Sequence, residues 1–382
     1  MPWNAQNAMQ VRLEFVTLAT KAEIPFSELC RRFRVSRQTG YKWVERYQAH
    51  GLEGLIERSR RPHASANRTS DEMESHVLEM RTRHPAWSAH KIGRRLRDQG
   101  LQGVPADSTL NAILRRHGCI SAQASANATA WIRFEREQPN ELWQMDFKGH
   151  FALLDHTRCH PLTVLDDHSR FNIVLRACQA QNTQTVREHL QNAFAEYGLP
   201  QQINTDNGAP WGTPSKPGEL TELAIWLILL GIRVSYSRPY HPQTNGKDER
   251  FHRSFKREVL SHCSFTGMSQ AQAEFDCWRR IYNFERPHHG IGMNTPHTRY
   301  QPSPRMMPST LAPPEYGPCD EVLRVGWNGK VRFRGQHLRV SSALHGRDIA
   351  ARPSREITDA YDFYFAHHRL MTFDLNQPDA PR

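Results

Sequence analysis

The chain has 382 residues, of which 38% are hydrophobic, and a formal net charge of +11. This length predicts two to four domains, each with a core of its own. The longest apolar run, residues 224–230, is too short to cross a bilayer, and the first residues have the pattern of neither a signal peptide nor a transit peptide. These features exclude an integral membrane protein and predict a cytoplasmic one.

Most of the surplus positive charge lies in the N-terminal third. Residues 1–137 hold 22 Lys and Arg against 14 Asp and Glu, a net charge of +8, whereas residues 138–300 hold 17 against 16. A polyanionic partner such as DNA would therefore meet the N-terminal third first, through contacts to its phosphates. The alternative is a surplus that only aids solubility.

Residues 10–48 have the pattern of three short helices. Ser36 offers an N-cap to the third, and Tyr41, Trp43, Val44 and Tyr47 supply its apolar residues. This is the pattern of a helix-turn-helix domain over residues 1–57, with an ordinary helical hairpin as the alternative. The side chains predicted to reach base edges lie near the start of the third helix. They are Arg37, Gln38 and Lys42.

Residues 58–69 form a basic linker that lacks apolar periodicity and contains Arg58, Arg60 and Arg61. It is a solvated linker or an arm along a minor groove, and the two roles are compatible.

A second helix-turn-helix-like domain is predicted over residues 70–118, with helices near 70–83, 88–99 and 107–117. Ser88 or Trp87 opens the middle helix, and Asp107 or Ser108 caps the third. Arg115 and Arg116 end the third helix and are further predicted DNA contacts. Residues 119–140 form a loose connector.

From residue 141 the periodicity changes to that of an α/β domain, which we expect to extend to residue 300. The predicted strands are 142–154, 160–167, 171–178, 201–205 and 232–236, of which the first three form an antiparallel meander. The predicted helices are 183–197, 219–230, 244–261 and 269–284. Residues 301–318 are a Pro-rich linker, and residues 319–376 a small β-rich domain with cations on one face, for contact with DNA or protein.

Three acids in this region are candidate catalytic residues. Asp146 alternates with the apolar Met145 and Phe147 on a strand, and Asp206 follows the next-to-last strand. Glu249 shares a helix face with Arg253 and Lys256, at i+4 and i+7, whereas its neighbour Asp248 falls on the apolar stripe.

No cysteine or histidine cluster accompanies these acids, and the seven scattered cysteines are expected to be free thiols. Carboxylates of this kind prefer hard cations. Two Mg²⁺ (or Mn²⁺) ions about 3.5–4 Å apart could activate the attacking oxygen and stabilise the leaving one in phosphodiester chemistry. Two rival carboxylates, Asp166 and Asp167, stand at a hairpin, where we favour turn capping.

Five stretches together resemble the DDE transposases of insertion sequences, which share their catalytic core with retroviral-type integrases. These stretches are 143–146, 164–170, 205–208, 241–250 and 282–288. The resemblance implies a ribonuclease H-like fold, with Asp146, Asp206 and Glu249 holding two divalent metals. It also implies that Arg253 and Lys256 grip DNA ends, and that residues 240–246 form a loop covering the site. Gln243 and Lys247 are included among the DNA contacts. The 42 residues between Asp206 and Glu249 exceed the family's usual spacing, with the extra length in residues 211–218.

The function implied is that of a transposase, which would bind the terminal inverted repeats of a mobile element and catalyse DNA cleavage and strand transfer. Its partners would be double-stranded DNA, at the element ends and the target, and a second copy of the chain in a homodimer or higher multimer. Its location would be the bacterial cytoplasm, in association with the nucleoid. A catalytically silent, transposase-derived repressor is the alternative, and a stand-alone ribonuclease H-like nuclease is a third hypothesis.

Overall fold

The computed structural model describes residues 8–57, 69–120, 135–212, 219–237 and 246–376. The predicted DNA contacts Arg58, Arg60, Arg61 and Gln243 lie outside these residues. The chain divides into two compact units, Met1–Arg68 and Thr69–Arg382. No helix in the described ranges combines the length and the apolar character that a membrane span requires.

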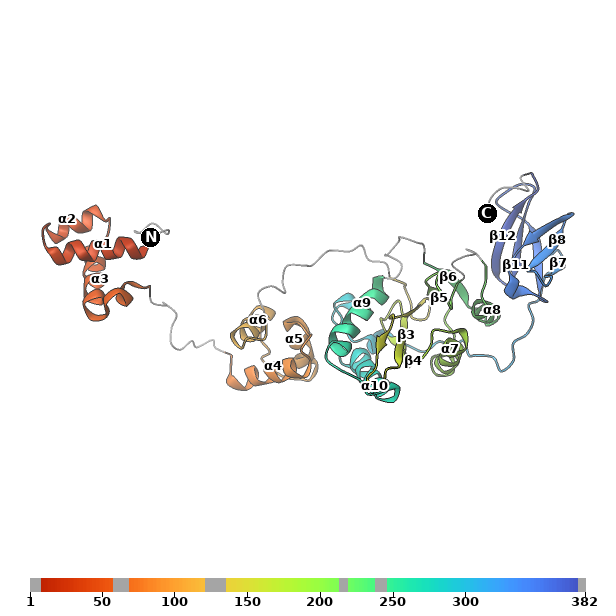
Figure 1. Ribbon diagram of the computed structural model, residues 1–382, viewed down its shortest axis with the longest axis horizontal. Coiled ribbons are helices and arrows are strands. Elements are labelled where there is room, and N and C mark those ends of the chain that lie inside the picture. The colour runs from red at the N-terminus through yellow and green to blue at the C-terminus, as the bar shows by residue number, and fades with distance from the viewer. Residues whose placement is uncertain (1–7, 58–68, 121–134, 213–218, 238–245, 377–382) are drawn as a thin grey trace. The chain divides into compact units, whose positions relative to one another are not determined.

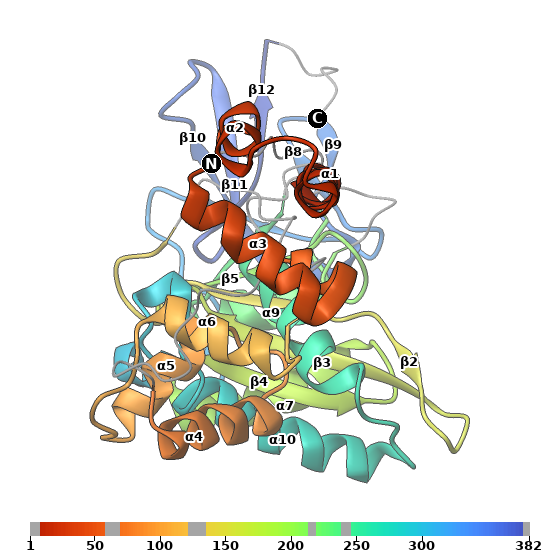
Figure 2. The ribbon, with the colours of Figure 1, turned by 90° about the vertical axis from the view of Figure 1, so that its left-hand side faces the viewer.

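The first unit is a small helical bundle (Figure 2). Its elements are α1 (Ala8–Lys21), α2 (Phe26–Arg32), α3 (Arg37–His50) and the 3-10 helix η1 (Gly51–Leu55). The side chain of Ser36 accepts a hydrogen bond from the amide of Thr39, which confirms the predicted cap. Gly40 lets the helices approach closely, because a Cβ there would lie 2.9 Å from the sulfur of Cys30. Tyr41, one of the apolar residues predicted for the third helix, is 60% exposed.

The second unit begins with three more helices around a core of its own. These are α4 (Asp71–Arg83), α5 (Ala89–Asp98) and α6 (Asp107–Arg116). The predicted cap of α6 is wrong, because Ala106 occupies the N-cap and neither Asp107 nor Ser108 caps the helix. The carboxylate of Asp107 instead bonds to the ring of His90, which joins α6 to α5.

A mixed sheet follows these helices. Its strands are β1 (Trp143–Phe147), β2 (Phe151–Ala152), β3 (Arg158–Asp166), β4 (Asn172–Cys178), β5 (Gln202–Thr205) and β6 (Arg233–Tyr236). Strand β3 pairs antiparallel with β1, β2 and β4, whereas β5 pairs parallel with both β1 and β6. The predicted strand 142–154 is divided in two, because Gly149 takes a left-handed conformation (φ +81°) between β1 and β2.

Helices cover both faces of this sheet. They are α7 (Thr183–Tyr197), α8 (Glu222–Leu229), α9 (Gly246–Phe255), the π-helix η3 (Lys256–Leu260), α10 (Met268–Phe284), and the short 3-10 helices η4 (His289–Ile291) and η5 (Pro296–Arg299). Apolar side chains of α7 and α8 share one core with the sheet, and those of α9 and α10 form a second core on its other face. Figure 1 shows β3 and β4 between these two sets of helices.

The chain ends in a small β-rich domain, as predicted. Its elements are β7 (Glu321–Arg324), β8 (Lys330–Phe333), β9 (Gln336–Arg339), the 3-10 helix η6 (Ser342–Leu344), β10 (Asp348–Pro353), β11 (Ala360–Phe365) and β12 (His368–Asp374). Four of the strands form an antiparallel sheet in the order β12-β11-β10-β7, and β8 pairs with β9. The Ser341 hydroxyl donates to the carbonyl of Leu220, 3.0 Å away, so this domain contacts the segment that leads into α8.

Part of the predicted Pro-rich linker lies against the α/β domain. The amide of Ser303 donates to the carbonyl of Tyr197 at 2.7 Å, and the guanidinium of Arg305 donates to the carbonyls of Pro200 and Gly231. The architecture predicted from the sequence is therefore confirmed in kind: helical units, a ribonuclease H-like α/β core with a mixed sheet, and a β-rich C-terminal region.

Candidate active site

Asp146 occupies the fourth position of β1, and its side chain is 28% exposed. Its neighbours Met145 and Phe147 are buried in the core, at 1% and 9% exposure. This is the alternation of a strand, so the carboxylate lies on the opposite face from the two apolar side chains. One carboxylate oxygen accepts a hydrogen bond from the amide of Phe147 at 2.7 Å.

Asp206 follows β5 directly, beside β1. The parallel register pairs Gln144 with Asn204, and Asp206 lies two residues beyond that pair, near enough to Asp146 for its charge to act on it. The carboxylate of Asp206 accepts from the amide of Gly208 at 3.0 Å. A Cβ at Gly208 would lie 3.2 Å from a carboxylate oxygen of Asp206, so the glycine leaves that carboxylate room.

The electrostatics of Asp146 reflect this gathering of acids. The pKa of Asp146 is raised to about 7. Burial is the largest cause, the nearby charge of Asp206 is the next, and the charge of Glu249 has a weaker effect in the same direction. The amide of Phe147 and the cation of Lys148 act in the opposite direction. A carboxylate held beside like charges is stabilised by a cation, and carboxylates are the ligands that Mg²⁺ and Mn²⁺ prefer.

Glu249 and Asp248 lie on different faces of α9. Glu249 is exposed, as are Arg253 and Lys256 one and two turns later, whereas Asp248 is only 1% exposed. Burial raises the pKa of Asp248 well above its ordinary value, and its Oδ1 has no hydrogen-bond partner within the described part of the chain. The helix face therefore presents Glu249, and not Asp248, to solvent.

The carboxylates of the three acids are suitable ligands for a divalent metal, but they do not form a complete metal site. Within the described ranges, no group of three or more His, Cys, Asp or Glu side chains is placed to hold an ion. Asp146 lies on β1, Asp206 directly follows the adjacent strand β5, and Glu249 comes from α9, with the charges of both other acids acting on Asp146. Asp146 on β1, Asp206 after β5 and Glu249 on α9 can each supply one carboxylate to a metal.

The two rival carboxylates at the hairpin are satisfied within the protein. Asp166 caps the turn as predicted, accepting from the amide of Ser169 at 2.8 Å. For Asp167 the predicted turn cap is wrong: its fully buried carboxylate accepts from the amide of Arg136 at 2.9 Å and forms an ion pair with Lys247. The ammonium of Lys247 was predicted to contact DNA, yet its side chain is only 15% exposed and is engaged by this pair.

Two supports of α9 were not found from the sequence. His252 and Thr163 connect the helix to the strands by a hydrogen bond of 2.8 Å. Arg286, within the stretch 282–288, forms a buried ion pair with Glu258 at 2.8 Å and also donates to Ser254 at 3.1 Å. The only available signal was the presence of Arg286 in a stretch that carries the family resemblance.

Comparison with known proteins identifies the family models that the chain matches. Residues 136–242 match one model of an integrase core domain, and residues 230–296 match a second. The chain carries an integrase core. Residues 11–63 match a helix-turn-helix domain, and residues 39–114 match a homeodomain-like domain. The integrase core thus contains all three acids at 146, 206 and 249.

Two curated relatives come from bacterial insertion elements. The chain is 32% identical over 160 residues to a 39.2 kDa protein of element IS476 from Xanthomonas euvesicatoria, covering 41% of this chain and 43% of that protein. It is 29% identical over 173 residues to a 31.7 kDa protein of IS407 from Burkholderia multivorans, covering 43% and 59%. The chain thus spans about half the length of these relatives.

Among solved structures, the chain is similar to the HTLV-2 integrase catalytic core domain, determined in complex with magnesium. The superposition has a TM-score of 0.34 and 16% sequence identity, and it covers 43% of this chain and 99% of that one.

The predicted DNA contacts that lie outside the integrase core and within the described ranges are exposed. Arg37, Gln38 and Lys42 lie on the first turns of α3, and Tyr41 lies among them. The ring of Tyr41 stacks on Phe26, with ring centroids 4.2 Å apart, so this aromatic side chain is held in place while it faces solvent.

In the second helical domain, Arg115 and Arg116 are exposed at the end of α6, as predicted, and Arg116 forms an ion pair with Glu74. The same domain contacts the integrase core through α5, because Arg95 pairs with Glu285 at 3.0 Å.

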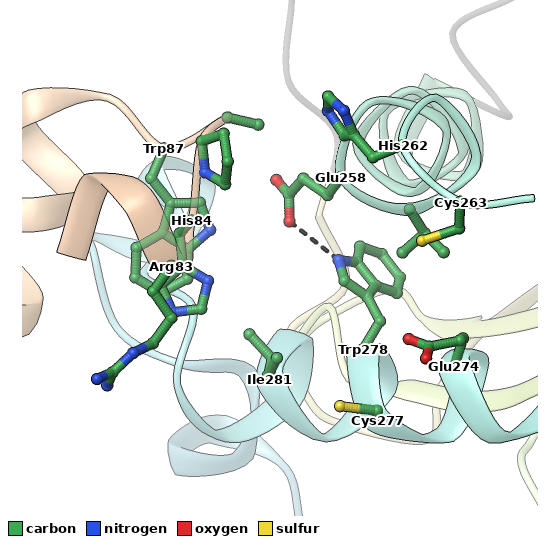
Figure 3. Close-up of a pocket in the computed structure, with 13 residues that line it drawn as sticks. Arg83, His84, Trp87, Glu258, His262, Cys263, Glu274, Cys277, Trp278 and Ile281 are labelled. Carbon is green, nitrogen blue, oxygen red and sulfur yellow. Dashed lines mark hydrogen bonds between the residues drawn. The ribbon is translucent and has the colours of Figure 1, made fainter. Parts of the chain in front are cut away.

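A cavity of about 140 Å³ lies where these helices meet the integrase core (Figure 3). Trp87 lines it from one side and Trp278 and Ile281 from α10 on the other, and the indole of Trp278 donates to Glu258 at 3.0 Å. None of the three acids lines this cavity.

Proposed function

We propose that the chain is a DDE-type transposase of an insertion sequence, which cleaves DNA at element ends and joins those ends to target DNA. The observation that carries the proposal is that Asp206, directly after β5, lies close enough to Asp146 on the adjacent strand β1 for its charge to raise the pKa of Asp146, with Glu249 exposed on α9. The integrase core and the helix-turn-helix match support it, as does the origin of the relatives in insertion elements.

In this proposal Asp146, Asp206 and Glu249 hold two Mg²⁺ or Mn²⁺ ions. When bound, such ions favour the ionised form of the attacking oxygen and stabilise the leaving one. Asp146 and Asp206 would orient their carboxylates from the sheet, and Glu249 would close the site from the helix. Arg253 and Lys256, exposed on the same helix face, would contact DNA phosphates.

The reaction consists of two displacements at phosphorus. The oxygen of water attacks a phosphodiester at the element end, and the 3′ oxygen of the element leaves as a hydroxyl. That 3′ oxygen then attacks a target phosphodiester and displaces another 3′ oxygen. Neither step requires a covalent bond between protein and DNA, so no Ser or Tyr nucleophile takes part.

The N-terminal unit would supply recognition of the terminal inverted repeats, with Arg37, Gln38 and Lys42 directed at base edges. Arg115 and Arg116 of the second helical domain would add contacts at a second place, and the linker residues Arg58, Arg60 and Arg61 would add phosphate contacts. Gln243 would touch DNA close to the acids.

The test uses the full chain, Mg²⁺ and a labelled duplex that carries the inverted repeats flanking the gene. Asp146→Asn, Asp206→Asn and Glu249→Gln should each reduce cleavage and joining by about 100-fold or more while DNA binding persists. Asp248→Asn, on the buried face of the same helix, and Glu188→Gln, an exposed acid on α7, are the controls expected to stay active.

Two results would contradict the proposal. If Asp248→Asn abolished joining and Glu249→Gln did not, the wrong acid of the pair would have been assigned to the site. If the wild-type protein bound the repeats specifically but cut no DNA with either Mg²⁺ or Mn²⁺, the chain would be a DNA-binding repressor derived from a transposase.

A further inference from the structure

Helix α9 and strand β1 are joined by a link of two hydrogen bonds. Thr163 stands opposite Asp146 in the antiparallel ladder between β3 and β1, and it is fully buried. Its hydroxyl donates to the backbone carbonyl of Asp146, 3.0 Å away. The same hydroxyl oxygen lies 2.8 Å from Nε2 of His252, on α9.

The direction of the second bond follows from the first. A carbonyl oxygen can only accept, so the single hydroxyl proton of Thr163 points to Asp146. The hydroxyl oxygen must then accept from His252, and the proton of this bond resides on Nε2. The ring is held in one orientation, with its other nitrogen, Nδ1, 3.9 Å from a carboxylate oxygen of Asp146.

His252 stands three residues after Glu249, one turn along α9. The two hydrogen bonds therefore connect α9, which carries Glu249, to the backbone of Asp146 on β1. On its buried face the helix is also held by Phe251 and Phe255, which pack against Trp278. These apolar contacts dock the helix but do not reach Asp146.

We propose that His252 is a positioning residue that, through Thr163, fixes Glu249 relative to Asp146 and thereby sets the affinity of the acids for a divalent cation. This inference rests on the proposed function, because it takes the acids as metal ligands. Groups that orient metal ligands without touching the metal commonly change affinity by about 10- to 100-fold when they are removed.

Two pairs of variants distinguish loss of the hydrogen-bonded link from loss of the fold. His252→Leu removes the donor, and His252→Gln retains an amide donor of similar reach. Thr163→Val removes the hydroxyl without changing side-chain size, and Thr163→Ser retains it. Thr163→Val also leaves His252 beside the Asp146 carboxylate, so it tests the hydrogen-bonded link alone. Melting temperatures and circular dichroism of the full-length variants report on the fold.

The readout is the affinity of the full chain for Mn²⁺ in the absence of DNA. The electron paramagnetic resonance signal of free Mn²⁺ measures how much of the ion remains unbound. We expect His252→Leu and Thr163→Val each to weaken binding by about 10-fold or more. The Gln and Ser variants should stay within about threefold of wild type. The double variant His252→Leu/Thr163→Val should be no weaker than the weaker single variant, because both remove one link.

Mn²⁺ affinity equal to wild type in both His252→Leu and Thr163→Val would overturn the inference. Fully additive losses in the double variant would overturn it as well. Asp146→Asn and Glu249→Gln establish the reference: if wild-type binding did not depend on these two acids, the proposed function itself would fail, and the positioning role with it.

Discussion

At the scale of single residues, the assignment of the third acid depends on one position along a helix. Asp248 and Glu249 are adjacent and chemically similar, yet a step of one residue rotates a side chain by about 100° around the helix. Asp248 consequently faces the core with Phe251 and Phe255, whereas Glu249 faces solvent with Arg253. The apolar spacing along the sequence contains this information, because buried residues recur at helical intervals.

Lys91 on α5 is a partly buried cation in unfavourable surroundings. Burial, and then the positive charge of Arg286, lowers its pKa to about 7, although Glu258 acts in the opposite direction. In the unfolded chain this lysine would keep its proton up to its ordinary pKa of 10.5. Between pH 7 and pH 10.5 the unfolded state therefore binds more protons, and the free energy of unfolding rises with pH.

We therefore predict that wild type gains stability relative to Lys91→Met as the pH rises from 7 to 9, by roughly 1–2 kcal/mol. Urea unfolding at several pH values, with tryptophan fluorescence as the signal, measures the difference in the free energy of unfolding between the two proteins. Taking that difference cancels other titrating groups, among them the thiols of Cys159 and Cys178. Lys42→Met, an exposed lysine of the other unit, should keep the wild-type slope. Equal slopes for wild type and Lys91→Met would contradict the prediction.

At the scale of elements, α3 combines exposed polar side chains with a fixed aromatic ring. Tyr41 is held against Phe26 and stands beside Arg37, Gln38 and Lys42. A rigid aromatic side chain loses little conformational entropy on binding. The first turns of α3 therefore offer hydrogen-bonding groups and an apolar surface to a DNA groove.

If α3 reads the inverted repeats, Arg37→Ala and Tyr41→Ala should lower the ratio of affinities for repeat and random DNA. Loss of one good base contact costs about 1–3 kcal/mol, or roughly 5- to 150-fold in that ratio. Lys21→Ala, an exposed cation at the end of α1, should leave the ratio unchanged. Fluorescence anisotropy with both duplexes at two salt concentrations provides the measurement, and an unchanged ratio in both α3 variants would exclude α3 as the reading helix.

Elements whose signals are local were predictable from the sequence. The cap of α3 by Ser36 and the face of α9 depend on residues within a few positions of one another. The proximity of Asp146 and Asp206 was different, because it depends on the pairing of β1 with β5, which are far apart in the chain. The same holds for the bond between Thr163 and His252, 89 residues apart. No periodicity contains such pairings.

The break between β1 and β2 and the cap of α6 illustrate a second limit. Gly149 was a visible signal for a break, but its conformation depends on how β2 returns to β3. Asp107 has the side chain of a cap, yet a neighbouring helix supplies His90 as a partner. Tertiary contacts override a local preference where they offer a better partner.

At the scale of the whole molecule, the proposed function requires two element ends to be cleaved, whereas one chain carries one set of the three acids. In the proposed function, Asp146, Asp206 and Glu249 form one reaction centre in each protomer. Cleaving and joining two ends therefore calls for at least two protomers, and two-fold association is the commonest symmetry of homo-oligomers. The division of the chain at residue 68 adds a second possibility, because a unit with its own core can serve a neighbouring active site.

We predict catalysis in trans, in which the N-terminal unit of one protomer binds the end that its partner cleaves. A Glu249→Gln protein retains the N-terminal unit but lacks a complete site, whereas a protein lacking residues 1–68 retains the site but not that unit. Each should be inactive alone, and their mixture should recover joining of labelled ends. Up to about a quarter of wild-type activity is expected, because random pairing makes half of the dimers mixed and each mixed dimer combines one N-terminal unit with one intact site. Light scattering on DNA ends must show that the two proteins assemble together. If they assemble and the mixture still joins no DNA, each protomer cleaves the end that its own N-terminal unit binds.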